Sequence, residues 1–489
     1  MRKLILIFLF FILSISLLPA VNGILTDMGD RYLLHVWGTH YERGEALGYL
    51  MGDQIKDLFD NYFFTTVVGS NAYVYNTYRQ YHQEHFVTED RYLQEIQGIV
   101  AGMQLAGTNL YHAGLDRELD EIDFLFINSI VDLSNAQISL ACSSLSSWGN
   151  ATVNDPQLQG KLQITRLLDW HRSPVLISNP LLVVHHPSEA DEMKWISFTY
   201  PSLIGALSAI SQEQAAAFLN VGNSHPNIDD EELSAVLLNV RNGIERRDYN
   251  NDSVYSNQDL WDALSDGNHL TGSIIHSVQE WPDSSRALIF ETNNTGTVSR
   301  AHGENSGIAG DNLAATNHFR KLIDPVYCSR YAEIIDSLNQ SSEVSIARQW
   351  DLMAGACGVQ YNMMMIQYMP SQNTVKWSIA TSYYGAYHEE AMVLDTNALF
   401  TLPSAIQDAT APQVSRLHLY PNPLGPGGVL REASEKELTR VKVYNIKGQK
   451  VYDAETLPIA EDFHASGVYI VVSEDVSGIS YKNRIICSK

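Results

Sequence analysis

Cysteine and positive charge are both scarce in this chain. Four cysteines in 489 residues are too few and too scattered for a disulfide framework. No CxxC pair and no HExxH sequence occurs, and the neighbours His185 and His186 would point to opposite faces of a strand. The chain has 32 lysine and arginine residues against 56 acidic residues, a formal net charge of −24. This charge disfavours binding to nucleic acid and to anionic lipid surfaces. We therefore expect no metal, no cofactor and no nucleic-acid partner.

Long apolar runs are also lacking, except at the start of the chain. Arg2 and Lys3 precede an apolar run over 4–18, followed by the small residues of "LPAVNG". This pattern is typical of a signal peptide, which we place at 1–23. The alternative is a single membrane anchor, but the run is shorter than the roughly 20 residues that a span needs. We expect an exported protein, secreted or at the cell surface, without a stable membrane span.

The pattern of apolar residues along the body of the chain changes at position 142. Residues 24–141 have apolar residues at three- and four-residue spacing, as in "DRYLQEIQGIVAGMQLAG" (90–107), and are expected to be mostly helical. From 142 to 405 short β-rich runs such as "LQITRLLDW" and "LLVVHHP" alternate with polar turns and a few helical stretches. The sequence predicts one large α/β domain over this body.

The tail, 406–489, is expected to be a separate small β sandwich. A proline- and glycine-rich stretch leads into alternating apolar runs. "YPNP" (420–423), "VYNIKGQKV" (443–451), "SGVYIV" (466–471) and a short basic end resemble the C-terminal sorting domain of the bacterial type IX secretion system. The resemblance implies the type IX machinery as a partner, export through the periplasm and outer membrane of a bacterium, and removal of the tail.

Cys142 is the residue around which chemistry can be argued. It stands in "SLACSSLSSWGNATVND" (139–155), and by itself it would most simply be a small buried apolar residue. "TRLLDW" places Arg166 and Asp169 three residues apart on a β-rich run. A guanidinium lowers the pKa of a nearby thiol, and a carboxylate can orient a protonated amine. An ordinary surface ion pair is the alternative for these two residues.

Two asparagines and a later arginine complete the candidate set. Asn220 follows an apolar strand, and Asn317 lies in "LAATNHF". Asparagine amides can donate hydrogen bonds where negative charge develops, although turns and caps are their commoner use. Arg330, in "YCSRYAEII", stands at the start of an expected helix, where a salt bridge is the ordinary role.

No histidine follows Cys142 in a recognisable catalytic context, so the thiol needs another base. The α-amino group of the cysteine itself would serve if the chain were cut just before it, between Ala141 and Cys142. An α-amine has an unperturbed pKa of about 7.7–8.0, which suits proton transfer near neutral pH. The residues before the cut would then form a pro-segment, 24–141.

The ordered set of motifs resembles a known family. "GTHYERGEALGYLMGDQI", "ACSSLSSWG", "TRLLDW", "FLNVGN", "TNHF" and "SRYAEI" occur in the order seen in acyl-coenzyme A:6-aminopenicillanic-acid acyltransferase-like proteins. These are autoproteolytic N-terminal-nucleophile (Ntn) hydrolases, related to choloylglycine hydrolase, acid ceramidase and N-acylethanolamine acid amidase. The resemblance implies a four-layer αββα sandwich over 142–405, a helical pro-segment and cleavage of linear amide bonds.

The resemblance also implies roles for the site residues. Cys142 would be the nucleophile, Arg166 the arginine beside it and Asp169 the carboxylate that binds the free amine. Asn220 and Asn317 would be the oxyanion and amine-orienting asparagines, and Arg330 the later active-site arginine.

Several alternatives stay open at this point. The acyl and amine parts of a small-molecule substrate cannot be read from the sequence, and acyl transfer to an amine is an alternative to hydrolysis. A phospholipase B-like amidase or lipase and an inactive surface-binding protein are the other readings. Cys328 and Cys357 could form a disulfide or remain thiols.

Overall fold

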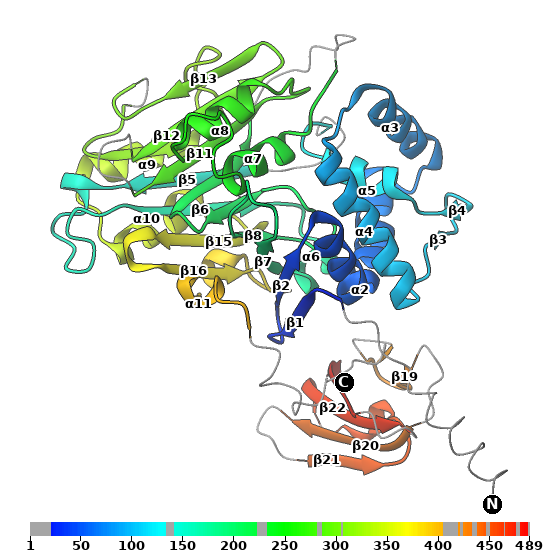
Figure 1. Ribbon diagram of the computed structural model, residues 1–489. Coiled ribbons are helices and arrows are strands. Elements are labelled where there is room, and N and C mark those ends of the chain that lie inside the picture. The colour runs from blue at the N-terminus through cyan, green and yellow to red at the C-terminus, as the bar shows by residue number, and fades with distance from the viewer. Residues whose placement is uncertain are drawn as a thin grey trace, which may run out of the picture. The chain divides into compact units, whose positions relative to one another are not determined.

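The computed structural model divides into two compact units, Met1–Leu402 and Pro403–Lys489, each described by itself (Figure 1). The expected signal peptide lies outside the described residues up to position 20, as do positions 421–423 of "YPNP". The structure describes residues 21–133, 141–222, 232–280, 286–304, 307–403, 419–420, 424–432, 438–445, 450–463, 465–475 and 480–487.

The first unit is a mixed α/β body with two large sheets, as the sequence predicts. The larger sheet has nine strands in the order β1-β2-β7-β8-β9-β10-β11-β12-β13, all antiparallel except for the parallel pair β2–β7. Its strands are β1 (Gly23–Asp27), β2 (Tyr32–Gly38), β7 (Leu181–Pro187), β8 (Trp195–Thr199), β9 (Ser208–Ser211), β10 (Ala215–Val221), β11 (Ser273–Gln279), β12 (Ala287–Asn293) and β13 (Gly296–Arg300).

The second sheet has six antiparallel strands in the order β14-β5-β6-β15-β16-β17. They are β5 (Ala141–Ser147), β6 (Gln163–Asp169), β14 (Asn312–Ala315), β15 (Asn362–Met369), β16 (Thr374–Ile379) and β17 (Met392–Asp395). β5 packs against β10 of the larger sheet. Because side chains alternate along a strand, β5 and β6 each send one set toward the larger sheet and the other set outward.

Helices cover the sheets. α7 (Val236–Glu245) and α8 (Asn257–Ser265) pack on the nine-stranded sheet, whereas α9 (Ser329–Gln340) and α10 (Ile346–Cys357) pack on the six-stranded one. Leu145 and Leu167 face outward and form a hydrophobic cluster with α9 and α10. The short helical segments are η2 (Gly149–Ala151), α6 (Pro174–Ser178), η3 (Pro370–Gln372), η4 (Ala386–His388) and α11 (Thr396–Leu399).

The segment before Cys142 is largely helical but begins with two strands. β1 and β2 belong to the nine-stranded sheet, because β2 pairs in parallel with all seven residues of β7. This segment is therefore built into the same core as the rest of the first unit. Its other elements are α2 (His40–Leu58), the π-helical η1 (Phe59–Val67), α3 (Ala72–His85), α4 (Asp90–Ala106), β3 (Tyr111–His112), β4 (Arg117–Glu118) and α5 (Glu121–Asn128).

Glycines in "YERGEALGYL" allow α2 and α4 to pack backbone to backbone. A Cβ atom at Gly44 would lie 1.9 Å from the carbonyl oxygen of Glu95, and one at Gly48 would lie 2.0 Å from that of Ile99. Only glycine fits such contacts. Thr39 caps α2 through a reciprocal capping box with Glu42, which fixes where the helix begins after β2.

The second unit contains a four-stranded antiparallel sheet in the order β21-β20-β22-β23, with its own hydrophobic cluster. Among the described residues of the whole chain, no helix is both long and apolar enough to cross a bilayer. The strands of this unit are β18 (Leu419–Tyr420), β19 (Arg431–Glu432), β20 (Leu438–Asn445), β21 (Lys450–Ala454), β22 (Gly467–Asp475) and β23 (Ser480–Cys487), with one short helical turn, η5 (Ala460–Asp462).

Candidate active site

Cys142 is the second residue of β5 and is completely buried. It belongs to the core that joins the two sheets to the N-terminal helices. Its backbone N–H donates to Oδ1 of Asn317 at 2.9 Å, and Nη2 of Arg166 lies 3.4 Å from its Sγ. Both the thiol and the backbone nitrogen of this residue are thus held by side chains that lie far from it in the sequence.

Arg166 lies on β6, beside β5, and its side chain is fully buried. Its Nη2 also donates to the carbonyl oxygen of Leu219 at 2.7 Å, whereas Nε and Nη1 have no partner among the described residues. Burial lowers the pKa of Arg166, and Cys142 and Asp169 oppose that effect. An anionic sulfur at Cys142 would therefore find a charged donor that no carboxylate neutralises by direct contact.

Asp169 and Arg330 form an ion pair at the end of β6. Nη1 of Arg330 donates to Asp169 Oδ2 at 3.3 Å, to the Cys142 carbonyl oxygen at 3.1 Å and to Ser143 Oγ at 2.9 Å. Nη2 of Arg330 donates to Oδ1 of Asn317. Arg330, at the start of α9, thus contacts β5, Asp169 and Asn317 together.

The two candidate asparagines differ in position. Asn317 accepts from the Cys142 N–H and donates to the Val221 carbonyl oxygen at 2.8 Å, so it bridges the two sheets. Asn220, on β10, donates to Ser144 Oγ at 3.3 Å, and its buried Oδ1 has no partner in the part of the chain that the structure describes. Asn220 therefore contacts β5 two residues beyond Cys142.

Burial dominates the electrostatics of the site. It raises the pKa of the Cys142 thiol above its usual value, although Arg166 and Arg330 act in the opposite direction. Burial also raises the pKa of Asp169 to about 6, against the effect of Arg330 and of a hydrogen bond from Asn362. In the continuous chain the thiol is held mostly protonated near neutral pH, while Asp169 titrates in the mildly acidic range.

The geometry brings five of the predicted residues into one contact group: Cys142, Arg166, Asp169, Asn317 and Arg330. Asn220 joins this group through Ser144, and Ala141 precedes Cys142 on the same strand.

Sequence reasoning missed Asn362. Its Nδ2 donates to Asp169 Oδ1 at 3.1 Å and to two backbone carbonyl oxygens at the bulge where β15 meets β6. A lone asparagine at the start of a strand carries no signal for this role.

All four cysteines are free and buried, so Cys328 and Cys357 are thiols here.

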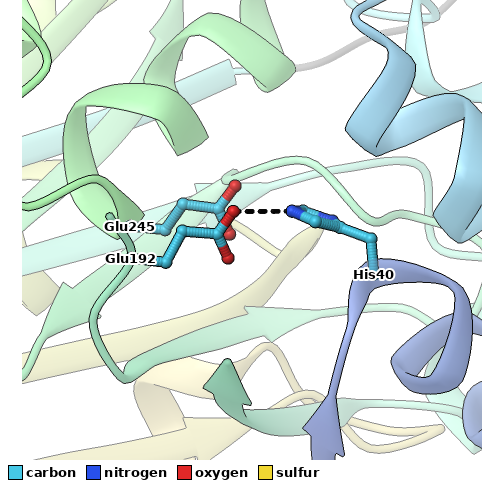
Figure 2. A group of neighbouring side chains, drawn as sticks. All are labelled: His40, Glu192 and Glu245. Carbon is cyan, nitrogen blue, oxygen red and sulfur yellow. Dashed lines mark hydrogen bonds and ion pairs between the residues drawn. The ribbon is translucent and has the colours of Figure 1, made fainter. Parts of the chain in front are cut away.

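A second cluster of buried titratable groups joins the N-terminal helices to the part of the first unit that follows Cys142. Figure 2 shows His40, at the start of α2, pointing toward Glu192 and Glu245; one ligand atom from each lies within 4.8 Å of the others. His40 Nε2 is 2.7 Å from Glu192, while Arg43 and Arg241 already bond Glu192 and Glu245. A metal ion would be repelled by these guanidinium groups, so the donor set suits an ion network better than a metal site.

Ionic contacts explain the charge states of this network. Burial opposes the ionisation of Glu192, but His40 and Arg43 outweigh it and hold the pKa of Glu192 at about 2. Its hydrogen bond with Glu192 and a 2.7 Å bond to Glu95 raise the pKa of His40 despite the burial of this residue. The network therefore favours the protonated form of His40 in the folded chain.

His185 and His186 lie on β7, as expected, and have different partners. His185 stacks on Trp195, with ring centroids 4.1 Å apart. His186 Nε2 lies 3.1 Å from Nδ1 of His35 on β2. Burial lowers the pKa values of both residues, so these are neutral core imidazoles.

Comparison with known proteins shows limited similarity, and no family model matches the chain. Protein dcd1B of Dictyostelium discoideum is 25% identical over 218 residues, covering 40% of this chain and 40% of its own length. Protein dcd1A of the same organism is 24% identical over 209 residues, covering 37% of this chain and 42% of its own length. The chain thus matches only about two-fifths of the length of these curated relatives.

Two solved structures are similar at a low level. A Caenorhabditis elegans N-acylethanolamine-hydrolyzing acid amidase ortholog is 14% identical, with a TM-score of 0.36, over 52% of this chain and 100% of that one. A mutant conjugated bile acid hydrolase from Clostridium perfringens is 7% identical, with a TM-score of 0.34, over 53% of this chain and 94% of that one. Any activity assigned to this chain must therefore be argued from the geometry around Cys142.

Proposed function

We propose that this protein is a cysteine Ntn hydrolase that cuts its own chain between Ala141 and Cys142 and then hydrolyses linear amide bonds through an acyl-enzyme on Cys142. One observation carries the proposal. Cys142 lies near the N-terminal end of the buried strand β5. Its thiol contacts Arg166, and its backbone N–H donates a hydrogen bond to Asn317. A residue that serves only as core packing needs neither contact.

Self-cleavage would be an acyl shift from nitrogen to sulfur. The Cys142 sulfur attacks the Ala141 carbonyl carbon, the C–N bond breaks, and the thiol proton ends on the nitrogen that leaves. Water then hydrolyses the thioester, which frees the Ala141 carboxylate and the α-amine of Cys142. Asn317 and Arg330, already bonded to the nitrogen and the carbonyl oxygen of Cys142, would hold the new terminus in place.

Turnover would use that amine as the base. The amine takes the thiol proton, the sulfur attacks a substrate amide carbon, and the departing amine receives the proton. Arg166 stabilises the thiolate, and Asn220 donates to the oxyanion of the tetrahedral intermediate. Asp169 compensates the positive charge that gathers at Arg330 and at the cysteine amine. Water then releases the acyl group, and an amine acceptor in its place would make the reaction an acyl transfer.

The finer parts of the proposal concern family and location. We assign the chain to the acyltransferase-like group of Ntn hydrolases with a four-layer αββα arrangement, supported by the ordered motifs and by helices packed on both sheets. We also propose export and a type IX sorting role for residues 406–489, supported by the tail motifs and a tail unit with its own hydrophobic cluster.

The test compares the full chain with its Cys142→Ala variant by intact mass and N-terminal sequencing. The wild type is expected to give two fragments, the second beginning at Cys142, whereas the variant stays in one piece. Cys487→Ala, which removes a buried cysteine from the other unit, is the matched control and should be cut like the wild type. An uncut, inactive wild type would favour the surface-binding alternative, and a cut Cys142→Ala chain would refute the mechanism.

A further inference from the structure

The serines that follow Cys142 are divided between two faces of β5. Ser143 and Ser147 face outward and bond Arg330 and Gln349. Ser144 and Ser146 face the larger sheet, on the same side as Cys142, and both bond one histidine, His276 of β11. The inward pair has no part in the mechanism described above.

His276 bridges the inward serines while completely buried. Its Nδ1 lies 2.9 Å from Ser144 Oγ and its Nε2 lies 2.8 Å from Ser146 Oγ. Burial, with help from Arg300, lowers the pKa of His276 to about 3, so the ring is neutral. A neutral imidazole has one donor and one acceptor, and each serine must therefore play a different part.

The two ends of this series of hydrogen bonds determine which atom donates and which accepts in each of them. Ser146 Oγ donates to the Leu313 carbonyl oxygen at 3.4 Å, so it accepts from the His276 Nε2–H. The His276 Nδ1 atom is then the acceptor, and Ser144 donates to it. With its proton used in this way, the Ser144 oxygen accepts from Asn220 Nδ2. Asn220, Ser144, His276, Ser146 and the Leu313 carbonyl thus form one hydrogen-bonded sequence with a consistent assignment of donors.

This sequence fixes which way the Asn220 amide points. If the Ser144 hydroxyl were free to donate, the amide could turn over and offer its oxygen to Ser144. The nitrogen would then occupy the place of the present Oδ1, and the two ends of the amide would be exchanged. Since the Ser144 hydroxyl donates its hydrogen bond to His276, it accepts one from an N–H of Asn220. The second N–H of Asn220 then remains for another acceptor.

We propose that Ser144 and His276 are positioning residues that orient the Asn220 amide as an oxyanion donor. This inference rests on the proposed function, because it assigns a partner to the residue that would stabilise the intermediate. It also accounts for the hydroxyl-rich strand after Cys142 and for a buried neutral histidine that does not contact the thiol.

A double-mutant cycle tests the inference, with p-nitrophenyl acetate as the acyl probe and processed full-length protein as the enzyme. Ser144→Ala is expected to lower kcat roughly tenfold with little change in KM, and Asn220→Ala by roughly 100-fold. If Ser144 acts through Asn220, adding Ser144→Ala to Asn220→Ala costs nothing further. Ser147→Ala, which changes a serine on the outward face, is the matched control and should leave kcat unchanged.

The outcomes separate this inference from the proposed function. Losses of kcat that multiply in the double variant would show that Ser144 has only a structural role and would overturn the inference. If Ser144→Ala does not fold, Ser146→Ala provides the same cycle, because it frees the other side of His276. A wild type without Cys142-dependent release of p-nitrophenol, judged against Cys142→Ala, contradicts the proposed function and the inference together.

Discussion

Replacing Arg330 by glutamine changes the charge that stabilises ionised Asp169. Nη1 of Arg330 is 3.3 Å from Asp169 Oδ2, and the two side chains are 20% and 1% exposed. The pKa of Asp169 is about 6, because burial raises it and Arg330 opposes that rise. A hydrogen bond to a charged group contributes about 1.5–3 kcal/mol, and one pKa unit corresponds to about 1.4 kcal/mol. Taking the lower end for a long, partly exposed contact, the variant should raise the pKa of Asp169 by about one unit.

The rate of self-cleavage reports this shift if Asp169 must be ionised to hold the site together. Precursor made by cell-free translation is transferred to buffers across the acidic range, and conversion to two fragments is followed on gels. The acid limb of the wild type is expected to have its midpoint at about pH 6, and that of Arg330→Gln about one unit higher.

Arg348→Gln is the matched control, because the Arg348 side chain donates to the backbone carbonyl oxygens of Glu343 and Ser337 rather than to Asp169. Its midpoint should equal that of the wild type. Arg330→Gln chains that are cut with an unshifted acid limb would refute the electrostatic account of Asp169.

Two further predictions concern stability. Glu192→Gln removes the buried carboxylate that pairs with both Arg43 and His40, and leaves Glu189 beside Arg43 and Glu95 beside His40. The free energy of unfolding by urea should therefore fall by about 3 kcal/mol, against less than about 1 kcal/mol for Glu189→Gln, whose side chain is 24% exposed. Equal losses in the two variants would contradict the importance of the buried network. Burial raises the pKa of Asp132 from 3.8 to about 8, so its stabilising contribution is complete below pH 3.8 and is lost as the pH rises through about 8. Wild-type stability should therefore fall with rising pH relative to Asp132→Asn, and parallel pH profiles would show that Asp132 is ionised in the folded chain.

Local sequence patterns predicted many of the elements. The expected helix at 90–107 is α4, Asp90–Ala106, because its apolar residues recur at helical spacing and are buried together. The β-rich run before Trp170 is β6, Gln163–Asp169, buried along its whole length. The helix α3, Ala72–His85, lies in the segment that was expected to be mostly helical, but its own residues give little signal, because only Tyr75 and His82 are buried.

What the sequence alone determined are the properties that depend on neighbouring residues and on residue type. These are the acidic charge, the periodicity of helices and strands, and the presence of a thiol, guanidinium groups, a carboxylate and amides in a family-like order. From these the sequence predicted a set of side chains around Cys142, and the structure brings Arg166, Asn317 and Arg330 into contact with that residue.

Only the tertiary structure decided how those side chains are used. Arg330 reaches the Cys142 carbonyl oxygen across 188 positions of the chain, and Asn362 reaches Asp169 across 193, because strand register and the packing of α9 bring them together. The two asparagines looked alike in sequence, yet Asn317 bonds the backbone of Cys142 while Asn220 bonds Ser144. Which partner each polar group finds is set by how the two sheets face each other, and no local pattern of residues encodes that contact.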